Sequence, residues 1–321
     1  MLYSILRRRS AGVGFCAVLL QSGGAFAQAE PNLQIEEVMV TATKRAQSVN
    51  DIPVAVSAYS GESLKNSGIR DVGQLVQVNP TLDFGSSENA AGGSMSIRGM
   101  GTLGTDPGLE SSVGVFIDGV YRNRSGVALD ELGEIERIEV LRGPQGTLFG
   151  RNTSAGLVHV VSKGPSYDEA EAYVEVQAGN YNLRRLGLGA TGPLIEGKLA
   201  GRIDAIGTAR DGYIKDINGG NDLNDRDRYM LRGQLAWDIN DSLSSRFIVD
   251  YSKRNEECCG ALTSQKAFGA QDVSTLALTN PNDQGLDDDA DPYDYRTAVT
   301  SGRGRQDDTE AWGVSAELTW V

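Results

Sequence analysis

Two hydrophobic patterns divide the chain near Pro165. Before it, short runs of consecutive apolar residues alternate with stretches rich in Gly, Pro and Asn, which is typical of a compact domain with buried strands. After it, apolar and polar residues alternate one by one, which is typical of strands with one apolar and one polar face. The pattern predicts an α+β domain over residues 47–165 and a β-rich region over residues 166–321.

Two capped helices and a small sheet are predicted for the N-terminal domain. Ser60 is placed to cap a helix that runs through Asn66 and closes at Gly68, and Asp71 to cap a second helix that ends before Pro80. A further short helix and five strands rich in Val, Ile and Leu complete the domain: the helix covers Val127–Leu132, and the strands cover Val54–Ser57, Ser94–Arg98, Val113–Ile117, Ile135–Leu141 and Leu157–Ser162.

Six alternating strands are predicted after Pro165, within Ala172–Ala178, Arg185–Ala190, Leu199–Ala205, Tyr229–Asp238, Leu243–Tyr251 and Trp312–Trp320. A soluble β-sandwich also alternates. However, the polar faces here carry charge, and the long connections, 208–226 and 253–308, occur only at one end of the strands. This combination favours a transmembrane antiparallel β-barrel with lipid outside and a polar lumen inside.

Met1–Ala27 has the composition of a secretory signal peptide. Arg7–Arg9 form a basic start, Ala11–Leu20 is apolar, and Ala25-Phe26-Ala27 is a small-residue cleavage site. The apolar run is too short for a transmembrane helix, which needs about 20 apolar residues. We therefore expect export of the mature chain.

Composition argues against two large classes of function. Loss of Arg7, Arg8 and Arg9 with the signal peptide takes the formal charge from −13 to −16, whereas a nucleic-acid-binding protein needs a basic face. The chain holds one histidine, His159, which its Val neighbours mark as a core or sheet-face residue. Gly99–Gly104 matches the GxGxxG pattern, but Asp106, Pro107 and Gly108 stand where a phosphate-binding helix would begin. We expect no enzyme activity, cofactor or resident metal.

The long connection after the fifth strand carries two features with open interpretations. Cys258 and Cys259 are adjacent, so they form a strained pair, bond partners elsewhere or remain free thiols. The acidic run Asp287–Asp291 is expected to be a solvated loop, with calcium binding as the alternative.

An extended stretch, Ile35–Arg45, follows the signal peptide. Val38, Val40 and Thr41 favour an extended conformation, and such a free strand suits pairing with the sheet edge of another protein. On composition alone, the first strand of an ordinary domain is the competing interpretation.

Five segments occur in the order found in one family. EEVMVTAT at 36–43, SIRGMG at 96–101, VFIDGVY at 115–121, IERIEVLRGPQGTLFGRN at 135–152 and GLVHVVSK at 156–163 together resemble TonB-dependent outer-membrane receptors of the iron-complex, or siderophore, type. The resemblance implies a plug domain inside a barrel of about 22 strands. It also implies outer-membrane lipid around the barrel, an iron chelate or similar nutrient as ligand, and TonB with its inner-membrane energising complex as partner.

The resemblance also implies roles for particular residues. The TonB box is expected at Glu37, Val38, Met39, Val40, Thr41 and Ala42 within a leader at 28–46. A charge cluster that locks plug to barrel wall is expected at Arg98, Glu136, Glu139 and Arg142, with Arg202, Asp204 and Arg232 as lumen partners. Substrate contacts are expected at Thr102, Leu103, Tyr121, Arg122 and Arg124.

Only six of the implied strands are visible, so we expect an N-terminal fragment of a longer receptor. The function implied is energised uptake of a ferric siderophore or other iron complex across the outer membrane. The alternatives are import of a carbohydrate or a cobalamin by the same receptor class, and a transport-inactive remnant that acts only as a binding protein.

Overall fold

The computed structural model describes residues 39–41, 44–45, 47–85, 93–102, 109–123, 126, 131–216, 221–257, 296–297 and 306–320, all of which belong to one compact unit, Val38–Val321. Several predictions lie outside these residues: the signal peptide Met1–Ala27, Glu37, Val38, Ala42, Leu103, Arg124, most of the Val127–Leu132 helix, Cys258–Cys259 and Asp287–Asp291. In the described part, no helix is long and apolar enough to cross a membrane.

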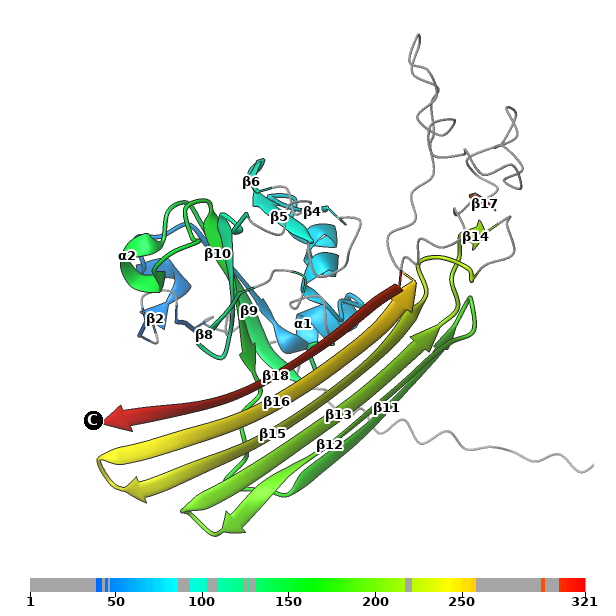
Figure 1. Ribbon diagram of the computed structural model, residues 1–321. Helices are drawn as coiled ribbons and strands as arrows, with labels where there is room; N and C mark the ends of the chain where they lie inside the picture. The colour runs from blue at the N-terminus through cyan, green and yellow to red at the C-terminus, as the bar shows by residue number, and fades with distance from the viewer. Residues whose placement is uncertain are drawn as a thin grey trace, which may run out of the picture. The chain divides into compact units, whose positions relative to one another are not determined.

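The N-terminal domain is built on a five-stranded sheet in the order β3-β9-β10-β7-β8. Strands β8, β9 and β10 of this sheet are labelled in Figure 1. β10 pairs parallel with β7, and the other three pairs are antiparallel. The strands of this sheet are β3 (Val56–Ser60), β7 (Val113–Ile117), β8 (Val120–Arg122), β9 (Ile135–Arg142) and β10 (Gly156–Ser162). A second sheet has three strands in the order β4-β5-β6: β4 (Leu82–Gly85), β5 (Ser94–Ile97) and β6 (Met100–Gly101).

The first predicted helix is confirmed as α1 (Gly61–Asn66). The Ser60 hydroxyl accepts a hydrogen bond from the Ser63 N–H, and Gly68 follows with a positive φ of 75°, a conformation that favours glycine. The second is η2 (Val72–Gln77), a 3₁₀-helix with the expected Asp71 cap. Two valines and Gly73 disfavour an α-helix, and Pro80 prevents its extension.

Two local predictions in this domain were incomplete. β3 begins at Val56 rather than Val54, because its pairing with β9 starts at Val56 opposite Leu141. The turn after β9 contains an unpredicted helical turn, α2 (Gly146–Phe149), which carries Phe149 into an apolar cluster. The remaining strands fall within one residue of the predicted bounds at each end.

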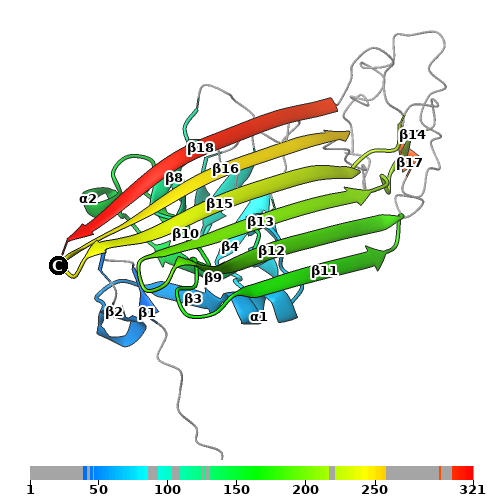
Figure 2. The same ribbon diagram turned by 90° about the horizontal axis from the view of Figure 1, so that it is seen from below.

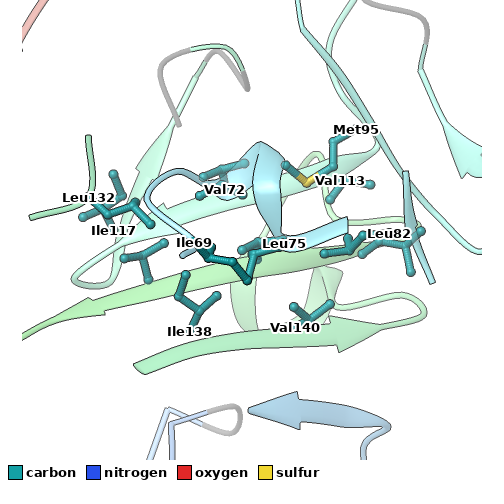
Figure 3. Packing of buried hydrophobic residues seen from close by; sticks show 14 of the residues in the cluster. Ile69, Val72, Leu75, Leu82, Met95, Val113, Ile117, Leu132, Ile138 and Val140 are labelled. Carbon is teal, nitrogen blue, oxygen red and sulfur yellow. The ribbon is translucent and has the colours of Figure 1, made fainter. Parts of the chain in front are cut away.

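The hydrophobic core of the domain lies between the five-stranded sheet and the segment of α1 and η2. Figure 3 shows Ile69, Val72 and Leu75 packed against Ile138 and Val140 of β9. Burial of each such side chain contributes about 1.5–3 kcal/mol. The α1–η2 segment is therefore held to the sheet mainly by apolar packing.

The C-terminal region forms a six-stranded antiparallel sheet in the order β11-β12-β13-β15-β16-β18 (Figure 2). Its strands are β11 (Glu171–Gly179), β12 (Leu183–Ile195), β13 (Leu199–Arg210), β15 (Arg226–Asn240), β16 (Leu243–Glu257) and β18 (Gln306–Trp320). Two short pairs complete the described strands: β1 (Met39–Val40) with β2 (Gln47–Ser48), which leads into η1 (Val49–Asp51), and β14 (Lys215–Asp216) with β17 (Arg296–Thr297).

The two faces of the six-stranded sheet have opposite character. We call the side with Val174, Leu188, Ala205, Leu231, Tyr251 and Trp312, which stand opposite one another across the sheet, the apolar face. The adjacent row, Tyr173, Gly189, Asp204, Arg232, Asp250 and Gly313, belongs to the polar face. Val174 is 70% exposed and Trp312 73%, whereas Arg232 is 4% exposed and Asp204 1%. The predicted alternation is confirmed, with the charged face buried and the apolar face open.

Candidate functional site

The described part of the expected TonB box, Met39–Thr41, lies against the N-terminal domain. Met39 and Val40 pair with Ser48 and Gln47, so these two residues form a strand pair within the chain. Val40 is fully buried among apolar side chains of the N-terminal domain: Ile52, Phe116, Leu141, Phe149 and Leu157. Its burial contributes about 1.5–3 kcal/mol to holding the segment in place.

A buried carboxylate holds the next residue. Glu139 of β9 is fully buried, and its Oε1 accepts hydrogen bonds from the Thr41 N–H at 2.8 Å, the Thr41 hydroxyl at 3.1 Å and Arg137 Nε at 2.8 Å. Burial raises the pKa of Glu139, but hydrogen bonds from His159, Thr41 and Arg137 outweigh it and lower that pKa to about 2. The carboxylate is therefore ionised at neutral pH and fixes the backbone of Thr41.

His159 of β10 lies beside this carboxylate, as expected for a sheet-face residue. Its Nε2 is 3.1 Å from the N–H of Gly119, a group that can only donate, so Nε2 is the acceptor. In the neutral ring, the proton is therefore on Nδ1, which faces Glu139 Oε2 at 3.5 Å and Thr41 Oγ1 at 3.4 Å.

Lys44 makes two further contacts near Thr41. The Lys44 N–H donates to the Thr41 carbonyl at 2.9 Å, and the Lys44 ammonium stands over the Phe149 ring at 4.5 Å from its centroid. A cation over an aromatic face contributes about 0.5–2 kcal/mol. A cavity of about 490 Å³, lined in part by Thr41, Lys44 and His159, lies next to the segment.

The structure describes all four residues predicted to lock plug to barrel wall: Arg98, Glu136, Glu139 and Arg142. Glu136 pairs with Arg137, and Glu139 binds Thr41 and Arg137. Arg142 donates to the Ser57 hydroxyl at 3.0 Å, and the exposed Arg98 has a positive φ of 54° at the turn after β5. Among the described residues, no hydrogen bond or ion pair joins any of these four to the six-stranded sheet. The role of these four residues as a lock between plug and barrel wall therefore stays a prediction.

Acidic residues just before β9 make the contacts that the prediction missed. Glu131 Oε2 is 3.1 Å from Arg185 Nε, and its Oε1 accepts from the Thr208 hydroxyl at 2.8 Å. Glu134 is 3.3 Å from Arg202, which also binds Asp204 within the sheet. The signal was present in the sequence as two acidic residues beside a buried strand.

Further contacts come from α1, η2 and their connection. Arg70 forms an ion pair with Glu175 at 2.8 Å. Asp71 caps η2 and lies 3.6 Å from Arg226 and 3.7 Å from Arg228. Burial raises the pKa of Asp71, and the two arginines only partly offset this effect. Of the expected lumen partners, Arg202 binds Glu134, Asp204 binds Arg202, and Arg232 donates to the Leu132 carbonyl at 3.2 Å.

The described candidates for substrate contact are already engaged. Arg122 Nη2 is 2.7 Å from Asp250 Oδ1 on β16, and the Tyr121 hydroxyl accepts from Asn152 at 2.8 Å. The Thr102 hydroxyl lies 3.3 Å from that of Ser112. The Arg122 side chain is therefore already paired with one carboxylate through Nη2. The role of this set in substrate binding stays a prediction.

The described residues contain no group of three or more His, Cys, Asp or Glu side chains placed to hold a metal ion. The contacts described above are docking contacts within the domain and charge pairs to the sheet.

Comparison with known proteins identifies the N-terminal domain. Residues 48–157 match the TonB-dependent Receptor Plug Domain. The chain is 28% identical over 204 residues to the pesticin receptor of Yersinia enterocolitica, an alignment that covers 62% of this chain and 29% of the relative. It is 27% identical over 288 residues to the ferrioxamine B receptor of Salmonella typhimurium, covering 87% of this chain and 38% of that relative. The chain thus spans between a quarter and two fifths of these curated relatives.

A solved structure shows the same fold. The ferripyoverdine receptor of the outer membrane of Pseudomonas aeruginosa, bound to ferripyoverdine, superposes with a TM-score of 0.65 over 88% of this chain and 34% of that chain, at 18% identity. The matched plug domain, the TonB-box-like segment docked on it and the sheet with a buried polar face follow one another in the order of this family. Residues 48–157 therefore form a TonB-dependent receptor plug domain, and the chain as a whole is similar to receptors that carry this domain.

Proposed function

We propose that the chain provides the plug domain and the first barrel strands of an outer-membrane receptor that takes up a ferric siderophore or another iron complex, using energy delivered by TonB. The observation that carries this proposal is the reversed burial of the six-stranded sheet, whose charged face contacts the plug while its apolar face is open. A sheet of this kind suits lipid on one side and a polar interior on the other.

The finer architecture is part of the proposal. The six strands belong to a closed barrel, because a membrane leaves no water to satisfy an open sheet edge. The domain boundaries are a signal peptide at 1–27, a periplasmic leader with the TonB box at 28–46, a plug at 47–165 and barrel strands from 166. TonB pairs by edge-strand addition with the described part of the TonB box, Met39–Thr41, which we call the box segment. This pairing requires Val40 and Thr41 to leave their docked position.

The choice of ligand is supported by what the relatives bind. The names of the relatives above include a ferrioxamine B receptor, and the superposed structure contains ferripyoverdine. Iron chelates of this kind are too large for diffusion through a narrow pore, which is consistent with an energised plug receptor.

Growth under iron limitation tests this function. A strain that depends on this receptor is supplied with single ferric siderophores, and uptake of radioactive iron is measured with and without TonB. Val40→Pro removes the N–H that edge-strand pairing needs, so uptake should be lost while ligand binding at the cell surface persists. Met39→Leu, at the exposed neighbouring residue and with its N–H retained, is the matched control and should retain uptake. Growth on a carbohydrate or a cobalamin instead, with no iron uptake, would replace the ligand class.

The candidate substrate contacts have their own test. Replacement of Arg122 and Arg124 with Ala should weaken binding of an anionic iron chelate about tenfold or more, since each removes a charge-assisted hydrogen bond. Arg151→Ala, at an exposed residue paired with Glu110, is the control. Unchanged affinity in the double variant would remove Arg122 and Arg124 from the site.

A further inference from the structure

A hairpin links the polar face of the sheet to the docked box segment. β7 and β8 are joined by the two-residue turn Asp118–Gly119, in which both residues have positive φ angles, 48° and 77°. This Asp-Gly turn is the tight form that matches the twist of antiparallel strands. The Gly119 N–H points away from the hairpin ladder and donates to His159 Nε2 at 3.1 Å.

The far end of the hairpin is attached to the sheet. Arg122, the last residue of β8, binds Asp250 of β16 at 2.7 Å. Gly313 stands opposite Asp250 on β18, and a Cβ at this position would lie 3.0 Å from Arg122 Nη1. The absence of a side chain at Gly313 leaves the space that the guanidinium occupies. A shift of β8 at Arg122 is therefore transmitted along two residues to the turn.

His159 occupies the middle of the path from this turn to the box segment. It lies on β10, where it stands opposite Glu139 of β9 on one side and beside Phe116 of β7 on the other. Its Nε2 accepts a hydrogen bond from the hairpin, and its Nδ1–H faces Glu139 and Thr41. Rotation of the ring to follow Gly119 changes the distances from its Nδ1 to Glu139 Oε2 and to Thr41 Oγ1, and so disturbs the carboxylate whose other oxygen, Oε1, holds Thr41.

We propose that His159 is a positioning residue that couples the β7–β8 hairpin to the box segment, so that displacement of Arg122 from Asp250 weakens the hold of Glu139 on Thr41. The path runs from Arg122 through the Gly119 N–H and the imidazole to Glu139 and Thr41. This inference rests on the proposed function, because release of the segment matters only if TonB binds it.

A second, apolar contact also joins the hairpin to the segment. Phe116 of β7 lines the site of Val40, and the Tyr121 ring of β8 lies 5.5 Å from the Phe116 ring. The test must therefore separate the polar path through His159 from this apolar path. A double-mutant cycle does so, because it isolates the interaction between two positions.

A spin label on the box segment reads its release. Met39→Cys is labelled in a Cys258→Ser, Cys259→Ser background, since Met39 is 45% exposed and a label there does not disturb the Val40 contact. The fraction of mobile label is measured by electron paramagnetic resonance in isolated outer membranes, for Arg122→Ala, His159→Gln and the double variant. Glu110→Gln, at an exposed carboxylate of the N-terminal domain paired with Arg151, is the matched control.

The proposal predicts coupling between the two positions. Arg122→Ala should raise the ratio of mobile to docked label about threefold or more, and should have little effect once His159 is Gln, as expected for residues of one network. Glu110→Gln should leave the ratio unchanged. Equal effects of Arg122→Ala in both backgrounds would overturn the proposal and assign the coupling to the Phe116 contact.

Two further measurements keep each outcome decisive. If His159→Gln alone releases the segment completely, a label at Val120→Cys is read instead while Val40→Ala loosens the segment, because coupling between two sites is reciprocal. If His159→Gln does not assemble, Glu139→Gln interrupts the same path at its next member. The readout needs neither ligand nor TonB, so a receptor that fails the uptake test can still show or lack this coupling.

Discussion

The plug domain and the six-stranded sheet arrange similar side chains in opposite ways. In the plug, Ile138 and Val140 of β9 are fully buried, while Glu136 on the same strand is exposed. In the sheet, Val174 and Val314 are about 70% exposed, while Arg202, Asp204 and Arg254 are buried. The comparison teaches that an alternating pattern specifies two faces, but the surroundings decide which face is covered.

The two regions also differ in the interactions that stabilise them. Apolar packing dominates inside the plug, whereas ion pairs and hydrogen bonds join the plug to the polar face of the sheet. Removal of one partner from a buried pair is costly because it leaves an uncompensated charge. The contacts between plug and sheet should thus be sensitive to single substitutions, although replacement of whole pairs is tolerated.

The largest expected effect is at Arg202. Arg202→Met leaves Asp204, which is 1% exposed, and Glu134 without their shared cation, so we expect a loss of about 3–5 kcal/mol. The midpoint of urea unfolding in detergent measures it. Lys253→Ala is the control, since its pair with Asp308 is exposed and contributes about 0–1 kcal/mol. Equal effects at both positions would contradict the inference that Arg202 and its partners are shielded from water.

The second prediction compares apolar residues of the two regions. Leu75→Ala removes a fully buried side chain from the plug core and should cost about 2–5 kcal/mol. Val314→Ala, on the apolar face of β18 and 69% exposed, should cost less than about 1 kcal/mol in detergent. Protease resistance of the plug and the urea midpoint report the two changes. A larger effect at Val314 than at Leu75 would reverse the comparison.

The third prediction uses two glycines of the sheet. A Cβ at Gly189 would lie 2.1 Å from the Tyr173 ring on the polar face, so Gly189→Ala should cost about 1–3 kcal/mol by overpacking. Gly233 has nothing within 4 Å of the same position, so Gly233→Ala should be nearly neutral. The same urea titration measures both variants. If Tyr173→Ala fails to restore the midpoint of Gly189→Ala, the Tyr173 contact is not the cause.

Much of the fold follows from local patterns in the sequence. The six strands and their faces were predictable because the side-chain period of a strand is two, and the Ser60 and Asp71 caps because their oxygens suit helix starts. The start of β3 was not, since it depends on its register with Leu141 far along the chain. α2 was missed because Gly146 and the preceding Gly143-Pro144 indicate a turn.

The site was less predictable for the same reason. The sequence predicted that Glu139 contributes to a lock with the barrel wall, and gave no sign of its hydrogen bond with Thr41, 98 residues away. The pairs of Glu131 with Arg185 and of Asp71 with Arg228 also join distant segments. Charge alone indicates that such residues need partners, and only the packing of the strands determines which partners they have.

The fourth prediction concerns two plug carboxylates that are shifted in opposite directions. Burial raises the pKa of Asp71, whereas the hydrogen bonds to Glu139 overcome burial and lower its pKa from 4.5 to about 2. A lowered pKa stabilises the folded state fully above the unfolded value, and this contribution is lost as pH falls. Glu139 should therefore stay ionised, and docking of the box segment unchanged by its titration, from neutral pH down to about 4.5. Docking should weaken as pH falls further toward 2.

Glu139→Gln separates this effect from general acid unfolding. The variant should dock Met39–Thr41 more weakly at neutral pH, because an amide oxygen accepts weaker hydrogen bonds than a carboxylate. It should also lose less docking than the unsubstituted protein between pH 4.5 and 2, because its own titration is gone. The spin label at position 39 measures both changes, and Glu110→Gln, whose partner is Arg151, should follow the unsubstituted protein. Parallel pH curves for Glu139→Gln and the unsubstituted protein would show that Glu139 does not hold the segment as an ionised group.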